Sequence, residues 1–125
     1  MKNSDAETVR AYVQRRRAER AALRAEKLLE AQRDFDRIVE YLINEYRPLR
    51  IYQWGSLLHT GHFSEISDID IAVEGLADPL AGLDAAAGAE RLTRFPIDLV
   101  ELERIHPAHA ESIKAHGRVV YERER

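Results

Sequence analysis

The most informative stretch of the chain is Ser67-Asp68-Ile69-Asp70-Ile71-Ala72-Val73, where polar and apolar side chains alternate. Alternation with a period of two predicts a β-strand with Asp68 and Asp70 on one face and the apolar side chains on the other. Two carboxylates this close repel each other unless a cation lies between them. Because both ligands are oxygen atoms, a hard cation such as Mg²⁺ fits best. An Asp-x-Asp is also common on solvated edge strands, so the motif alone leaves both interpretations open.

A second acid lies on a similar strand, Phe95-Pro96-Ile97-Asp98-Leu99-Val100. Its apolar neighbours should face the core and turn Asp98 toward the opposite face. If the two strands are neighbours, three carboxylates converge and can hold two divalent ions about 4 Å apart, as in phosphoryl and nucleotidyl transfer. The alternative is that Asp98 only keeps an edge strand soluble.

A third feature is Trp54-Gly55-Ser56, at the end of the predicted strand 49–54. Glycine lets the backbone turn sharply and approach a ligand closely. If a helix begins after Ser56, its free N–H groups would form a seat for phosphate. The alternative is an ordinary turn in which the serine caps a helix.

The remaining pattern predicts an α+β fold: a small mixed β-sheet with helices packed mainly on one face, preceded by a long N-terminal helix. Residues 5–46 contain neither Gly nor Pro, which favours helix, although the length suggests a break. We expect a helical extension over residues 1–47 and a domain over residues 48–125 that together form one compact unit. The other expected elements are strand 66–73, helix 78–94, strand 95–102, helix 106–116 and strand 118–121.

Composition narrows the class of protein. The 125 residues suit one domain, and the absence of cysteine excludes disulfides, thiol nucleophiles and Cys-ligated zinc. No apolar run could span a membrane and no signal peptide is visible, so we expect a cytoplasmic protein. The net charge of −3 combines +2 over residues 1–40 with −5 over residues 41–125. Residues 10–27 hold seven basic and two acidic side chains, which suits a solvated helix, a partner-docking arm or a nucleic-acid contact.

In order, these motifs resemble the DNA polymerase beta superfamily of nucleotidyltransferases, and most of all its minimal nucleotidyltransferase (MNT) branch. The resemblance covers roughly residues 49–121, through Gly55-Ser56, Gly61, Ser67-Asp68-Ile69-Asp70 and Ile97-Asp98-Leu99-Val100. It implies that Gly55 and Ser56 hold the β- and γ-phosphates of ATP or another nucleoside triphosphate. It implies further that Asp68 and Asp70 ligate two Mg²⁺ ions, and that Asp98 binds the catalytic ion and helps to activate the attacking hydroxyl.

Two departures from the family pattern concern the phosphate loop. Eleven residues, rather than the usual ten, separate Gly-Ser from Asp-x-Asp, and Leu57-Leu58-His59 replaces a stretch that commonly carries Arg. We interpret His59 as a nucleotide-binding residue, and Lys114 or Arg50 could supply the missing positive charge.

The resemblance implies a Mg²⁺-dependent nucleotidyltransferase that moves NMP, and most readily AMP from ATP, to a hydroxyl acceptor. MNT proteins often pair with a helical HEPN partner as toxin and antitoxin, so the acceptor is expected on a partner protein. The alternative is a weak or inactive binding module that neutralises such a partner by occlusion. The N-terminal helix could also form a homo-oligomer, whereas membrane and nucleic-acid partners are not expected.

Overall fold

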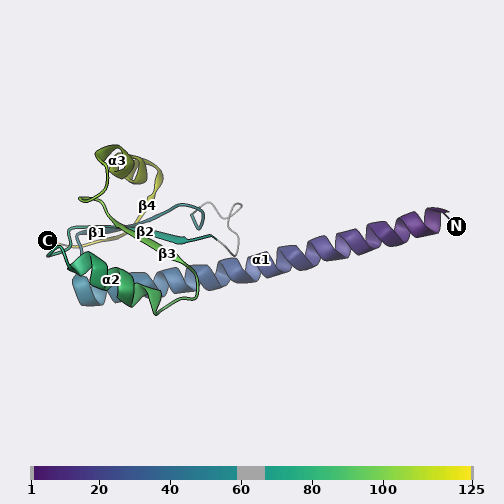
Figure 1. Cartoon of the computed structure of the whole chain (residues 1–125), viewed down its shortest axis with the longest axis horizontal. Coiled ribbons are helices and arrows are strands. Elements are labelled where there is room, and N and C mark those ends of the chain that lie inside the picture. The colour runs from purple at the N-terminus through teal and green to yellow at the C-terminus, as the bar shows by residue number, and fades with distance from the viewer. Residues whose placement is uncertain (1, 59–66, 125) are drawn as a thin grey trace.

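The computed structural model describes residues 2–58 and 67–124, which contain three helices and four strands (Figure 1). This confirms the predicted α+β class and the predicted order of elements. In chain order, the elements are α1 (Lys2–Tyr46), β1 (Arg50–Trp54), β2 (Ile69–Glu74), α2 (Ala81–Glu90), β3 (Ile97–Glu101), α3 (Pro107–His116) and β4 (Arg118–Glu122).

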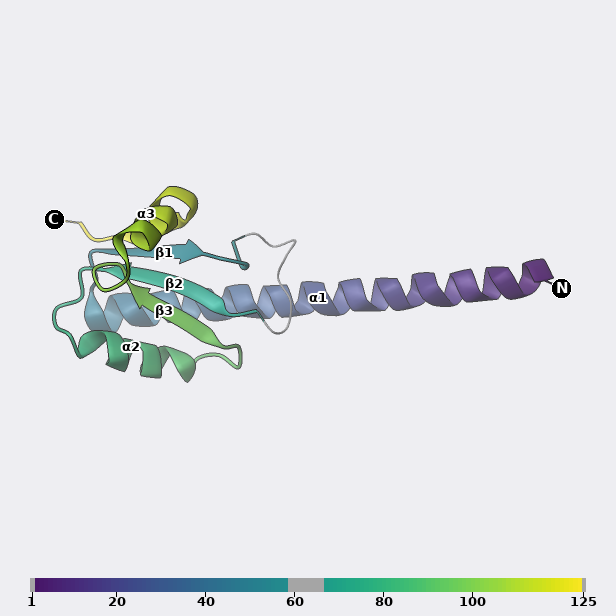
Figure 2. The ribbon, with the colours of Figure 1, turned by 45° about the horizontal axis from the view of Figure 1, so that its top comes forward.

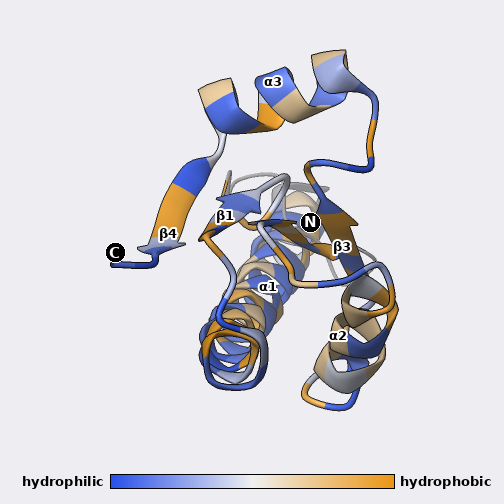
Figure 3. Cartoon of the chain, turned by 90° about the vertical axis from the view of Figure 1, so that its left-hand side faces the viewer, coloured by the Kyte–Doolittle hydropathy of each residue, from blue (hydrophilic) through white to orange (hydrophobic). Residues whose placement is uncertain are grey.

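The four strands form one mixed sheet in the order β3-β2-β1-β4. Strand β1 is antiparallel to both β2 and β4, whereas β2 and β3 are parallel. A parallel pair needs a crossover connection, which α2 provides. Figure 3 shows α1 and α2 on one face of the sheet and α3 on the other. Two of the three helices therefore share a face, as predicted.

Helix α1 runs for 45 residues, and the break that its length suggested is absent within residues 2–46. The helix ends where Arg47 adopts a left-handed conformation (φ 46°) and Pro48 follows. Its second half packs on the sheet through Phe35, Ile38 and Leu42, which are fully buried. Residues 4–26 are exposed and project away from the sheet (Figures 1 and 2).

Apolar side chains form one cluster on each face of the sheet. The larger cluster joins α1 and α2 to the strands through Phe35, Leu42, Ile51, Ile69, Ile71, Val73 and Ala85, among others. The smaller cluster lies under α3 and contains Tyr52, Ala72, Leu102, Ala110 and Ile113. Odd-numbered positions of β2 thus face α1 and α2, and even-numbered positions face α3, as the alternating pattern predicted.

Some element boundaries differ from those expected. The helix predicted over residues 78–94 covers only Ala81–Glu90, because the Asp78 side chain accepts hydrogen bonds from the backbone N–H groups of Leu80 and Ala81 and holds a turn before it. The strand predicted over residues 95–102 is Ile97–Glu101, because the Thr93 hydroxyl accepts a bond from the N–H of Phe95 in the preceding turn. The strand predicted over residues 66–73 is Ile69–Glu74.

Candidate functional site

Two of the three predicted acids lie side by side on the sheet. Strands β2 and β3 are parallel neighbours, and their register places Asp70 opposite Asp98. Residues that pair across neighbouring strands are about 5 Å apart and point to the same face. The structure therefore brings together two acids that are separated by 27 intervening residues.

The face that carries this acid pair is the face covered by α3. Ile69 and Ile71, on either side of Asp70, are buried in the cluster with α1 and α2. On the other neighbouring strand, Trp54 pairs with Asp70 and packs against the α3 cluster. The pair occupies the second position of both β2 and β3. It therefore lies at the end of the sheet where β2 and β3 begin and β1 ends. This end of the sheet faces the projecting part of α1 (Figure 2).

The environment of Asp70 opposes ionisation. The pKa of its carboxyl is raised from 3.8 to about 6, mainly by burial and in addition by the nearby charges of Asp98 and Asp68. One interaction acts the other way, since the backbone N–H of Ser56 donates a hydrogen bond that favours the ionised form. The site thus holds negative charge that a bound cation would stabilise.

The third acid, Asp68, is exposed and precedes the first residue of β2. Its charge reaches Asp70, but no three acidic or histidine side chains within residues 2–58 and 67–124 are grouped closely enough to hold one metal ion. The carboxylates are an oxygen-only donor set with unbalanced negative charge, which fits a hard divalent cation. Full coordination would require Asp68 to turn toward the acid pair.

The Gly55-Ser56 turn lies directly against Asp70. Gly55 has φ +77°, and a Cβ atom built on it would overlap the carboxylate of Asp70. Glycine is therefore required here both by the backbone conformation and by the close approach. The backbone N–H of Leu58 donates to the carbonyl of Gly55 at 3.2 Å, which closes the turn. The sequence motif predicted a seat for phosphate at this turn, and the structure places the turn within hydrogen-bond reach of Asp70.

The predicted nucleotide ligand His59 lies outside the described residues, as does Gly61. Neither basic substitute considered for the phosphate loop is close to the acid pair. Arg50 begins β1 and its guanidinium bonds the Glu74 carboxylate at 2.8 Å, while the ammonium of Lys114 lies 3.5 Å from the same side chain. Glu74 ends β2, four residues beyond Asp70, so both cations belong to the far end of the sheet.

Helix α3 adds residues that the sequence did not indicate. The rings of His109 and Trp54 meet edge to face with centroids 5.5 Å apart. Together with Gly55, Ser112 and residues 113, 116 and 117, they line a cavity of about 110 Å³ beside the glycine turn. The buried Nε1 of Trp54 has no hydrogen-bond partner among the residues that the structure describes. No sequence signal pointed to this cavity, because α3 is brought to Gly55 only by the path of the chain between β3 and β4.

Comparison with known proteins agrees with this arrangement. Residues 36–125 match the family model described as polymerase beta, nucleotidyltransferase. The matched region starts within α1 and contains every strand. Among curated proteins, none matches the chain. None of the described helices is long and apolar enough to cross a membrane.

Several solved structures share the fold. A chain from the crystal structure of the toxin–antitoxin MntA–HepT is 22% identical, with a TM-score of 0.57 over 74% of this chain and 73% of that one. A chain from a toxin–antitoxin structure with AMP-PNP is 24% identical, with a TM-score of 0.58 over 70% and 73%. One from the tri-AMPylated Shewanella oneidensis HEPN toxin in complex with MNT antitoxin is 23% identical, with a TM-score of 0.57 over 74% and 73%. Since the family model covers well over half of the chain, the protein is a member of the polymerase beta nucleotidyltransferase family.

Proposed function

We propose that the protein is a Mg²⁺-dependent nucleotidyltransferase that moves a nucleoside monophosphate, AMP from ATP, to a hydroxyl group and releases pyrophosphate. The observation that carries this proposal is the register of β2 and β3, which places Asp70 opposite Asp98, with the Gly55-Ser56 turn against the Asp70 carboxylate. A glycine turn beside paired acids can bind phosphate on one side and a divalent cation on the other.

Each residue has a proposed role. The backbone of Gly55 and the N–H and hydroxyl groups of Ser56 would hold the β- and γ-phosphates, and His59 would contact the nucleotide. Asp68 and Asp70 would ligate both ions, and Asp98 would bind the catalytic ion and orient the acceptor hydroxyl. Bound magnesium supplies the positive charge that balances the triphosphate and the attacking oxygen. The raised pKa of Asp70 supports a cation at this position, because a nearby positive charge favours the ionised carboxylate.

The acceptor is proposed to lie on a partner protein. Beside Gly55 the described residues line a cavity of about 110 Å³, which is small for a small-molecule acceptor next to a nucleotide. Chains of the same fold occur in complexes of an MNT antitoxin with a HEPN toxin, one of which is AMPylated. We therefore propose a helical HEPN-type partner that completes the site and receives AMP on a side-chain hydroxyl.

Label transfer tests this function. The protein is incubated with ATP labelled at the α-phosphate, Mg²⁺ and the purified product of the adjacent reading frame. We expect label on the partner with the wild type and none with Asp68→Asn/Asp70→Asn. Asp84→Asn, which removes an exposed acid on α2, serves as the control and should transfer as the wild type does. No transfer by the wild type, or equal transfer by the double variant, would exclude catalysis.

Two findings favour a second candidate, a module that neutralises its partner by occlusion. The acids of the described residues do not form a three-ligand metal site, and both basic substitutes lie at the far end of the sheet. In that case the partner binds tightly and equally well to the wild type and to a variant without Asp68, Asp70 and Asp98. The label-transfer experiment separates the two functions, because only the first one modifies the partner.

A further inference from the structure

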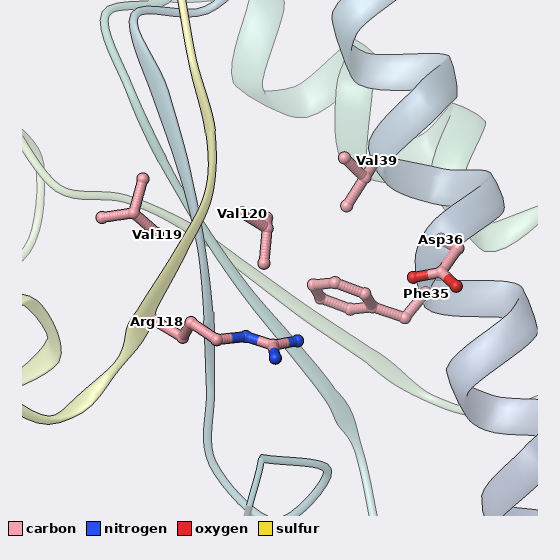
Figure 4. A pocket seen from close by; sticks show the side chains of 6 residues that line it. All are labelled: Phe35, Asp36, Val39, Arg118, Val119 and Val120. Atoms are coloured by element: carbon pink, nitrogen blue, oxygen red, sulfur yellow. The ribbon is translucent and has the colours of Figure 1, made fainter.

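A groove runs between α1 and the edge strand β4. It has a volume of about 400 Å³ and is lined by Phe35, Asp36, Val39, Arg118, Val119 and Val120 (Figure 4). Figure 3 shows why it is open: α1 and α2 lie under the other strands, and neither helix lies under β4. The walls are mostly apolar, with one acid and one base at the rim. A third helix in this place would complete the layer under the sheet.

The projecting part of α1 has a face that suits close helix packing. Ala11, Gln14, Ala18, Ala21 and Ala25 follow at spacings of three and four residues and therefore share one face. Residues 10–27 carry nine charged side chains, yet none falls on this line. Small side chains allow another helix to approach closely. Nothing in the described structure contacts this face, because residues 4–26 are exposed throughout.

The same line of residues continues to the groove. After Ala25, the spacing of three and four residues passes through Leu28 and Gln32 to Asp36 and Val39, which line the groove. An antiparallel copy of α1 lying along this line brings Ala18 opposite Val39 and Ala21 opposite Asp36. The twofold axis then falls between residues 28 and 29, where the Leu29 side chain is 58% exposed. One face of α1 thus supplies both the projecting segment and a wall of the groove that would receive the projecting segment of a second copy.

The basic N-terminal segment and the acidic remainder of the chain have complementary net charges. Residues 10–27 carry a net charge of +5, from seven basic and two acidic side chains. Residues 28–125 carry a net charge of −7, from 11 basic and 18 acidic side chains. Helix α1 is continuous and straight, so the basic segment cannot fold back on its own domain (Figures 1 and 2). A second copy can accept it, and opposite net charges favour that association. Antiparallel pairing also places Arg15 near Glu40 on the same flank.

From the groove, the uncharged face and the charge asymmetry, we infer that two copies of this chain form an antiparallel dimer through α1, in which the projecting segment of each copy fills the α1–β4 groove of the other. The contact is isologous, because each copy provides one arm and one groove. The groove lies on the α1 side of the sheet, whereas the acid pair lies on the α3 side, so the dimer does not depend on the proposed nucleotide chemistry. The large exposed apolar side chains near the N-terminus, Val9, Tyr12 and Val13, lie on other faces of the helix and stay accessible.

Solution mass tests the dimer. Light scattering coupled to gel filtration should give twice the chain mass of 14.4 kDa for the wild type and one chain mass for Ala18→Glu. Leu23→Glu introduces the same charge at a site that is 55% exposed on another face, and this variant should stay dimeric. Since neither residue contacts the domain, the thermal unfolding of the domain should be the same in both variants. A wild-type mass of one chain at every concentration up to about 100 µM, or an unaltered dimer of Ala18→Glu, would overturn the inference.

Single cysteines locate the contact, because the natural chain has none. Leu29→Cys, next to the predicted twofold axis, should oxidise to a covalent dimer in high yield. Leu23→Cys is equally exposed and should stay reduced under the same conditions. Equal yields from both variants, or cross-linking only at residue 23, would refute the antiparallel arrangement even if a dimer forms. The charge exchange Arg15→Glu with Glu40→Arg should restore any dimer that Arg15→Glu weakens.

Discussion

Replacing Asp70 by Asn should stabilise the metal-free protein at neutral and alkaline pH. The native carboxyl has a pKa of about 6 against 3.8 in the unfolded chain, so the native state binds the proton more tightly. Folding stability therefore falls as the pH rises from about 4 to about 6, and the whole cost is present above that range. The difference sets a ceiling of about 3 kcal/mol at about 1.4 kcal/mol per pH unit. Because Asp70 is only half-buried, solvent screening reduces the expected gain to about 1–2 kcal/mol.

Thermal unfolding in buffer with a chelator measures this gain. Asp70→Asn should raise Tm by roughly 4–8 °C at pH 8 and leave it nearly unchanged at pH 4. The Asn side-chain oxygen can still accept the hydrogen bond from Ser56, so the turn is kept. Asp84→Asn, at an exposed position in the first turn of α2, should not raise Tm at either pH. A gain of equal size at both pH values, or a lower Tm at pH 8, would refute the conclusion that ionised Asp70 destabilises the metal-free protein.

Three further predictions concern the backbone turn, the core and the surface. Gly55→Ala should lower stability by at least about 1 kcal/mol and abolish nucleotide binding, measured by chemical unfolding and calorimetry, because φ is +77° and the new methyl group meets a carboxylate. Leu42→Ala should cost about 2–5 kcal/mol in urea unfolding, since this side chain is fully buried, whereas Leu23→Ala should change stability by less than about 0.5 kcal/mol. A double-mutant cycle on the Arg94–Glu30 pair should give at most about 1 kcal/mol, because the 2.7 Å contact is solvent-exposed.

The sequence was sufficient to predict the acid pair. Alternation in residues 67–73 and 95–100 assigned Ile69, Ile71, Ile97 and Leu99 to one face and the acids to the other, and the core confirms this assignment. A one-residue slip of either strand would have buried its acid, so the register followed from the pattern. That the two strands are neighbours came from the family resemblance, and the parallel pairing confirms it.

Other features were not predicted from the sequence, or were predicted only in part. The placement of His109 against Trp54 follows from where α3 docks, which no local pattern fixes. The unbroken length of α1 follows from the absence of Gly and Pro, although a helix of average length would end sooner. We predicted that all three acids converge, whereas the structure pairs Asp70 with Asp98 and leaves Asp68 outside β2 with its side chain exposed to solvent.

The central claim is that the glycine turn and the acids together form a working site for a triphosphate and its metal. Isothermal calorimetry of the full chain with ATP and Mg²⁺ tests it most directly, with the wild type compared to Asp68→Asn. We expect saturable binding by the wild type that requires Mg²⁺, and a loss of at least tenfold in affinity in the variant. Equal affinities of the two proteins, or no heat of binding from the wild type, would contradict it.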